Sequence, residues 1–127
     1  MALAIRNGTE ADAVAVLALW RAAEALPTVT DDEAGLRALL AADPGALLLA
    51  ERDAELVGSL IAGWDGWRGS LYRLAVHPTR RREGIGAALV GAGERRLIGL
   101  WKAVGYERQA GRARFVRTLK DSAAVPE

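Results

Sequence analysis

The stretch LYRLAVHPTRRREGIGAALVGAGERRL, Leu71 to Leu97, decides how the rest of the sequence is interpreted. It begins with alternating apolar residues that are typical of a strand, passes through three arginines and Gly-Ile-Gly, and continues into an apolar helical segment. A helix that begins directly after a glycine loop has backbone N–H groups without internal partners, and its dipole places partial positive charge at that end. The stretch therefore predicts a binding site for an anion such as pyrophosphate.

The side chains around this helix start fit the same prediction. Glycines at 84 and 86 let a phosphate approach the backbone, and Arg80, Arg81 and Arg82 add forked donors suited to phosphate oxygens. Clustered arginines are also typical of nucleic-acid binding, but the spacing of the glycines has no role in that function. We therefore expect no nucleic acid among the partners.

Three known glycine-loop patterns can be compared with the sequence. The dinucleotide-binding pattern needs a third glycine, and the P-loop needs Gly-Lys-Ser/Thr; neither is present. The pattern R-x-x-G-x-G does fit, from Arg81 to Gly86. With LAVHP before it and AALV after it, this segment resembles the acetyl-CoA motif of the GNAT superfamily of N-acetyltransferases. IRNGTEADAVAVLALW resembles the first strand and helix of that family and IGLWKAVGYE its fourth helix and next strand, so the resemblance covers nearly the whole chain.

This resemblance implies a fold and a reaction. The fold is α/β and layered, with a mixed, mostly antiparallel central sheet flanked by helices, in a single domain of residues 1–127. The reaction transfers an acetyl group from acetyl-CoA directly to an amine of a small molecule or a protein, in a ternary complex and without a metal. The absence of cysteine suits direct transfer, because no thiol is present to carry the acetyl group. The alternative is a non-catalytic module that binds or senses CoA or acyl-CoA.

The resemblance also implies roles for individual residues. Strand backbone groups bind the pantetheine arm, the loop and helix amides bind the pyrophosphate, and Arg81 pairs with phosphate oxygens. The resemblance also implies a bulge near this point of the strand, which aims the amide of Val76 or Ala75 at the thioester oxygen. The expected cofactor-binding residues are Leu74, Ala75, Val76, Arg81, Arg82, Glu83, Gly84, Ile85, Gly86 and Ala87.

The general acid and base are not assigned by the resemblance. Trp101 stands where many members have a tyrosine that protonates the departing thiolate, and Ser70 or its neighbours stand where some have a glutamate base. His77 precedes a proline at a strand end and is interpreted as a turn residue. The candidates for proton transfer are Tyr72, Glu24, Glu51 and Asp65, and those for the acceptor site are Trp20, Trp64 and Tyr72.

Composition narrows the remaining possibilities. The 127 residues include one histidine and no cysteine, which argues against a thiolate metal site, a histidine cluster and a Ser-His-Asp triad. The longest uncharged run has ten residues, too few for a membrane span, and the N-terminus lacks the features of a signal peptide, so we expect a cytoplasmic monomer or homodimer. Residues 1–63 have a net charge of −6 and residues 64–127 of +7, which favours a cationic amine acceptor opposite an anionic cofactor.

Periodicity predicts the element order β-α-α-β-β-β-α-α-β. Capping boxes at Thr9–Asp12 and Thr30–Glu33 open the first two helices, and turns are expected at Asp53-Ala54 and Asp65-Gly66. Gly105 is expected to cap the fourth helix. The final strand is predicted within RARFVRTL, Arg112–Leu119.

The segment of residues 84–106 is too short for all the elements that the family resemblance implies there. The third and fourth helices occupy almost all of residues 84–106, which leaves no room for the fifth strand that the family places between them. Either that strand is absent, or a segment is missing from the chain near Leu97–Ile98; we favour the second. A missing segment predicts two neighbouring Cα atoms within Glu94–Gly99 that lie much farther apart than the usual ~3.8 Å.

Overall fold

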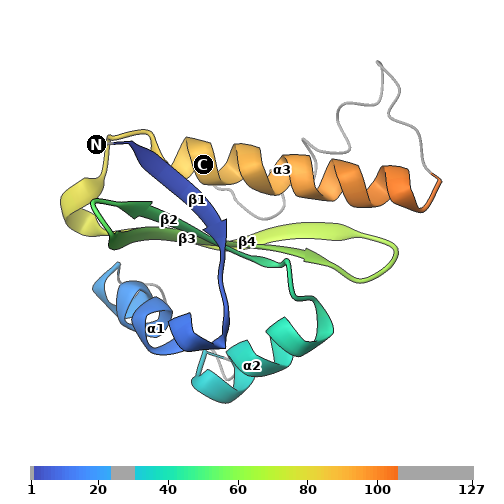
Figure 1. The fold of residues 1–127 in the computed structure, drawn as a ribbon, viewed down its shortest axis with the longest axis horizontal. Coiled ribbons are helices and arrows are strands. Elements are labelled where there is room, and N and C mark those ends of the chain that lie inside the picture. Colours follow the sequence, from blue (N-terminus) through green and yellow to red (C-terminus); the bar gives the residue numbers. More distant parts are fainter. Residues whose placement is uncertain (1, 24–30, 106–127) are drawn as a thin grey trace.

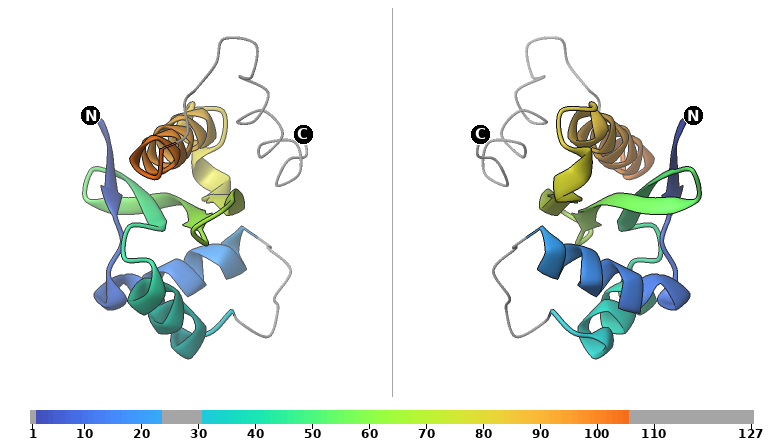
Figure 2. Two further views of the ribbon diagram at one scale, coloured as in Figure 1. Left: turned by 90° about the vertical axis from the view of Figure 1, so that its right-hand side faces the viewer. Right: turned by 90° about the vertical axis from the view of Figure 1, so that its left-hand side faces the viewer.

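The computed structural model describes residues 2–23 and 31–105. Within these ranges the chain forms a four-stranded sheet in the order β1-β2-β3-β4 (Figure 1). Helices α1 and α2 cover one face of the sheet and α3 covers the other (Figures 1 and 2). The elements in chain order are β1 Leu3–Asn7, the 3₁₀ turn η1 Glu10–Asp12, α1 Ala13–Ala22, α2 Glu33–Ala42, β2 Leu47–Arg52, β3 Glu55–Trp64, β4 Gly69–Val76, the 3₁₀ turn η2 Pro78–Arg80 and α3 Ile85–Ala103.

The layered α/β fold predicted from the sequence is confirmed, with one difference in the sheet. All three strand pairings in the described part of the chain are antiparallel, so the mixed character that we expected is not found there. The two tight turns lie where they were predicted. Asp53 and Ala54 have φ angles of 57° and 64°, as a two-residue hairpin turn requires, and Asp65 accepts hydrogen bonds from the N–H groups of Trp67 and Arg68.

Polar side chains cap the first two helices. Asp12 accepts a hydrogen bond from the Thr9 N–H (2.8 Å), as the predicted capping box requires. The second helix begins later than expected: Asp32, not Thr30, is its cap and accepts from the Gly35 N–H at 2.7 Å. Thr30 itself lies outside the described residues.

Each face of the sheet has its own hydrophobic core, because strand side chains alternate between the two faces. The core on the α1 and α2 side contains Ala13, Val16, Leu19, Trp20, Leu36, Leu40, Ala46, Leu47, Leu49, Ile61 and Ala75. The core on the α3 side contains Leu48, Ala50, Val57, Leu60, Ala62, Leu71, Ile85, Leu89 and Leu97. The glycine loop that precedes α3 thus connects a strand and a helix that both contribute side chains to the α3-side core.

The prediction of two separate helices after the loop is wrong. A single helix of 19 residues, α3, runs without interruption from Ile85 to Ala103, and Gly105 follows it with φ +98° as the expected cap. Its buried residues Ile85, Leu89, Gly93 and Leu97 repeat every four positions, so one face stays against the sheet throughout. ERRLIGLW contains no residue that breaks a helix, since glycine is tolerated inside one.

The continuous helix also contradicts the idea of a missing segment near Leu97–Ile98. No fifth strand is found among residues 2–23 and 31–105, and β4 is the edge strand opposite β1. The slot that two diverging strands would form for pantetheine is therefore not present in this part of the chain. What remains is the outer edge of β4 beside the start of α3. The predicted strand within Arg112–Leu119 lies outside the described residues.

Candidate functional site

The loop between β4 and α3 exposes unpaired backbone donors. Gly84 has φ +81°, a left-handed conformation that glycine adopts without strain, and it stands directly before the first helical residue, Ile85. Ala88 N–H donates to the Gly84 carbonyl at 3.1 Å, which is the first bond of the helix. The N–H groups of Ile85, Gly86 and Ala87 therefore have no acceptor within the helix.

Ile85 and Gly86 line a cavity of about 350 Å³, whereas Ala87 and Glu83, which were also predicted to bind the cofactor, are not part of its lining. Its wall combines the end of β4 with the glycine loop and the first turn of α3. The residues that line it are Ala23, Leu74, Ala75, Val76, Arg80, Arg81, Arg82, Gly84, Ile85 and Gly86. Arginines and free amides at one end with aliphatic side chains along β4 suit a ligand that has an anionic group and a long apolar arm.

Both glycines of the loop leave space for such a ligand. A Cβ atom added at Gly84 would meet nothing within 4 Å, so the approach to the helix amides is open. A Cβ at Gly86 would lie 3.9 Å from Leu74 Cδ2 and from Val76 Cγ2. A longer side chain at 86 would therefore extend into the space between α3 and β4.

Ion pairs anchor the loop to the neighbouring hairpin. Arg80 binds Glu55 (2.9 Å), and Glu83 binds Arg52, so the loop is attached at two points to the β2–β3 hairpin. Arg81 and Arg82 are exposed, and Arg81 Nε makes only a long contact (3.4 Å) with the Val76 carbonyl. Arg80 thus both lines the cavity and fixes the loop, whereas Arg81 and Arg82 line the cavity without an ion pair to the hairpin.

A β-bulge in β4 determines which side chains face this cavity. Tyr72 pairs with Ile61 and Ala75 with Ser59, so Arg73 and Leu74 together stand opposite Leu60. One extra residue reverses the alternation of the strand. Leu71 lies in the α3 core before the bulge, whereas Ala75 lies in the other core after it. Leu74 and Val76 consequently face the start of α3.

The backbone of β4 beyond the bulge is directed outward. His77 N–H donates to the Val57 carbonyl at 2.9 Å, so these two residues form a hydrogen-bonded pair. Hydrogen-bonded and non-hydrogen-bonded pairs alternate along antiparallel strands. The next pair, Val76 with Gly58, is therefore not hydrogen-bonded, and Val76 directs its N–H and C=O groups away from β3. Ala75 then directs its N–H toward Ser59. Of the two predicted thioester donors, Val76 is the one whose amide faces the open edge.

The aromatic candidates have different surroundings. Trp20 is buried and donates through Nε1 to Ser59 Oγ at 2.8 Å, and Trp64 packs against Trp101 with ring centroids 6.3 Å apart. Tyr72 is 42% exposed and lies beside Gly63, on the sheet face opposite Leu74. Burial raises the pKa of the Tyr72 hydroxyl, and the charge of Asp43 raises it further, so this phenol is protonated at neutral pH. None of the three lines the cavity.

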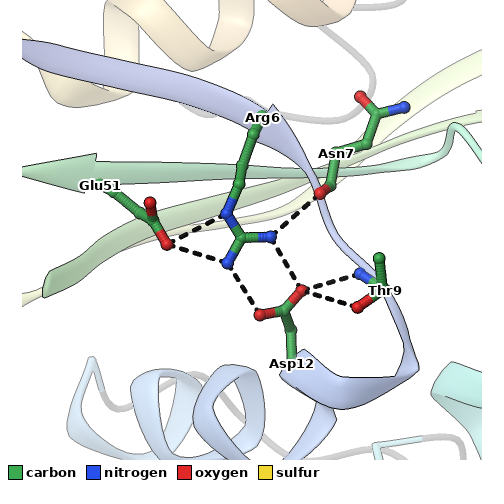
Figure 3. Close-up of polar contacts among 5 residues, drawn as sticks. All are labelled: Arg6, Asn7, Thr9, Asp12 and Glu51. Carbon is green, nitrogen blue, oxygen red and sulfur yellow. Dashed lines mark hydrogen bonds and ion pairs between the residues drawn. The ribbon is translucent and has the colours of Figure 1, made fainter. Parts of the chain in front are cut away.

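The carboxylate candidates are engaged elsewhere. Arg6 donates to Glu51 and to Asp12 at the same time, in the cluster that Figure 3 shows. Asp65 caps its turn, and the N–H groups of Arg68 and Trp67 lower the pKa of its carboxyl. Glu24 lies outside the described residues. No group of three or more His, Cys, Asp or Glu that would hold a metal is found within residues 2–23 and 31–105.

Sequence reasoning missed Ala23, which also lines the cavity. Arg80, expected to add donors for phosphate, lines the cavity together with Arg81 and Arg82. The bulge that the family resemblance implied near Ala75 and Val76 begins at Arg73, which has φ +56°. Nothing in the sequence marks Arg73 as its position, because arginine has no preference for positive φ.

A helix start with free amides beside an open strand edge suits a ligand that has a phosphate group and an extended arm. Comparison with known proteins shows which class this is. The model of the Acetyltransferase (GNAT) family matches residues 14–114, and the chain belongs to this family. An acetyltransferase of Pectobacterium atrosepticum is 42% identical over 94 residues, which are 74% of this chain and 67% of that protein. Over the first three curated relatives, the aligned part spans 58 to 67% of their length.

Solved structures agree on the fold. PaiA N-acetyltransferase from Thermoplasma acidophilum, in complex with coenzyme A, has a TM-score of 0.68 at 16% identity and covers 95% of this chain and 89% of its own. A GNAT family acetyltransferase from Brucella melitensis, in complex with acetyl-CoA, has a TM-score of 0.60 at 24% identity and covers 84% of each chain. In the described part of this chain, no helix is both long and apolar enough to cross a membrane.

Proposed function

We propose that the protein binds acetyl-CoA in the cavity beside β4 and transfers the acetyl group to an amine within a ternary complex. One observation supports this most strongly: the free amides of the first turn of α3, two exposed arginines and the outward edge of β4 all border one cavity. Relatives of the family bind the same ligand, as the complex of the Brucella protein with acetyl-CoA illustrates.

Different residues would bind different parts of acetyl-CoA. The N–H groups of Ile85, Gly86 and Ala87 would hold the pyrophosphate, and Arg81 would pair with its oxygens. The outward N–H and C=O groups of Val76 would bind the pantetheine arm as a neighbouring strand would, while Leu74 packs against it. An amide aimed at the thioester oxygen would stabilise the negative charge that develops there, and the loss of such a donor costs about 3–4 kcal/mol in comparable sites.

Acetyl-CoA supplies an activated carbonyl carbon. The amine nitrogen forms a bond to that carbon, the carbon–sulfur bond breaks, and the sulfur leaves with the electron pair of that bond. The amine loses one proton and the sulfur gains one. Because Glu51 and Asp65 are engaged elsewhere, we propose that an ordered water carries the first proton away. The Tyr72 hydroxyl is protonated at neutral pH, but it lies on the sheet face opposite Leu74 and does not line the cavity, so we assign it no role in proton transfer.

The charge of the acceptor is a separate proposal, which rests on the acidic first half of the sequence. Ion pairs reduce this argument, since Asp31, Asp43 and Glu55 bind Arg73, Arg96 and Arg80 of the second half. Part of the charge split is therefore neutralised within the fold. We keep a cationic amine as the acceptor to be tested first.

The second candidate is a non-catalytic module that binds CoA or acyl-CoA. One observation favours it: neither carboxylate candidate in the described residues, Glu51 or Asp65, is free to act as a base. Thiol release from acetyl-CoA, measured with a panel of cationic, neutral and acidic amines, separates the two. Transfer requires amine-dependent thiol release, whereas a sensing module binds the ligand in calorimetry and releases no thiol.

A further inference from the structure

Arg73 holds an unusual backbone conformation in the middle of a strand. Its φ of +56° is in the left-handed region, which disfavours a residue with a long side chain. The other non-glycine residues with positive φ in the described chain are Asp53 and Ala54 in a tight turn and Arg82 in the glycine loop. Arg73 is different because it forms the bulge of β4, immediately before the stretch that lines the cavity.

An ion pair and a ring contact help to fix the side chain of Arg73. Its guanidinium forms an ion pair with Asp31, which lies just before the start of α2, and stacks over the ring of Trp20 of α1 at 5.3 Å from the centroid. The side chains of Arg73 and Asp31 are only 18% and 12% exposed, so solvent screens this pair little.

The backbone carbonyl of Arg73 also has a polar contact, with Ser59 of β3. The hydroxyl of Ser59, a residue with no exposed surface, accepts from Trp20 Nε1 at 2.8 Å and lies 3.5 Å from the Arg73 carbonyl. Trp20 therefore contacts the bulge twice, through its ring and through Ser59. Arg73, Asp31, Trp20 and Ser59 together form what we name the bulge clamp.

From these contacts we propose that Arg73 is a positioning residue for acetyl transfer. The bulge clamp holds Arg73 in its left-handed conformation and thereby sets the direction of the backbone from Leu74 to Val76 along the cavity. The proposal rests on the proposed function, because it concerns how this backbone meets the pantetheine arm and thioester. Arg73 itself touches neither and does not line the cavity.

Hydrogen exchange with and without CoA separates this role from a general effect on stability. We expect CoA to protect two peptides of the wild type, one that contains Leu71–His77 and one that contains the first turn of α3. Glycine accepts positive φ, so Arg73→Gly keeps the bulge accessible while it removes the clamp. This variant should lose protection in the first peptide and keep it in the second.

Kinetics give the second readout. A small misplacement of reacting groups lowers the rate more than the affinity, so we expect Arg73→Gly to lower kcat about tenfold or more while KM for acetyl-CoA changes less than about threefold. Arg73→Lys retains the charge facing Asp31 and should recover part of the rate. Arg68→Ala is the matched control: it removes an exposed arginine stacked on Trp67 and should leave kcat and exchange unchanged.

The outcomes are distinct. If CoA protects neither peptide of the wild type, the proposed function fails before the clamp is tested. If CoA protects both peptides equally in the wild type and in Arg73→Gly, and kcat of the folded variant is unchanged, the clamp has no positioning role. If Arg73→Gly lowers the free energy of unfolding but changes neither the CoA protection nor kcat, Arg73 likewise has no positioning role.

Discussion

Asp43 and Arg96 form an ion pair that joins the two helical layers around one end of the sheet. Asp43 caps the C-terminus of α2, Arg96 belongs to α3, and their side chains are 17% and 18% exposed. Arg96 also donates to the Ala62 carbonyl at 2.6 Å, and Asp43 accepts from the Trp64 N–H at 3.1 Å. The pair therefore ties both helices to the end of β3.

Breaking this pair should destabilise the fold. Asp43→Ala leaves a mostly buried guanidinium without its partner, and we expect the free energy of unfolding to fall by about 3 kcal/mol, as measured by urea denaturation. Glu33→Ala is the control, because Glu33 and Arg37 form an exposed pair within α2 that contributes about 0.5 kcal/mol or less. Equal effects of the two substitutions would contradict the structural role of Asp43.

Stability should depend on pH through Asp12. Hydrogen bonds from Arg6 lower the pKa of the Asp12 carboxyl from its ordinary 3.8 to about 2. A carboxyl with a lowered pKa stabilises the fold above its unfolded pKa, and this contribution is lost as the pH falls through the folded pKa. We expect a loss of about 1 kcal/mol between pH 4 and 2, because Arg6 is 40% exposed and solvent screens the pair.

The variant Asp12→Asn tests this assignment. It removes the titrating group, so its free energy of unfolding should change less than that of the wild type between pH 4 and 2. Both proteins are compared by urea denaturation at each pH. A wild type and variant with parallel pH profiles would show that Asp12 is not responsible.

Two glycines of α3 should respond to alanine in opposite ways. A Cβ atom at Gly93 would lie 2.9 Å from side-chain atoms of Leu60 and Leu71, so Gly93→Ala should destabilise by about 1–3 kcal/mol. A Cβ at Gly99 would meet nothing within 4 Å, so Gly99→Ala should stabilise by up to about 1 kcal/mol, since alanine favours a helix. Thermal unfolding measures both. A destabilised Gly99→Ala would mean that α3 is not continuous at that position.

The sequence predicted the part of the site that depends on local contacts. A glycine loop before a helix exposes amides wherever it occurs, so Gly84, Gly86 and the arginines could be placed without the fold. The family resemblance implied a bulge near Ala75 and Val76, but its position at Arg73 could not be predicted from local contacts. Arg73 keeps its conformation through Asp31, 42 positions away, and through Trp20. The same holds for Glu51: only the pairing of β1 with β2 brings it to Arg6 and removes it from consideration as a base.

The fourth helix was mispredicted for a physical reason. Family resemblance suggested a strand between two helices, whereas the residues themselves favour one helix from Ile85 to Ala103. The four-residue spacing of buried positions passes through Leu97 without a turn residue, and this local pattern was the better guide. In this segment the local periodicity of the residues predicted the structure better than similarity to the family did.

The central claim is that acetyl-CoA binds on the bare amides at the start of α3, and calorimetry of CoA binding tests it most directly. Gly86→Glu places a carboxylate in the cavity without positive φ at that residue, and it should abolish binding, as should Gly84→Glu. Arg81→Ala should weaken binding by about 1.5–3 kcal/mol, the range for a hydrogen bond to a charged group. Arg95→Ala removes the same charge from an exposed position farther along α3 and should not change the affinity. Unchanged affinity in the folded Gly86→Glu, Gly84→Glu and Arg81→Ala variants would contradict the account.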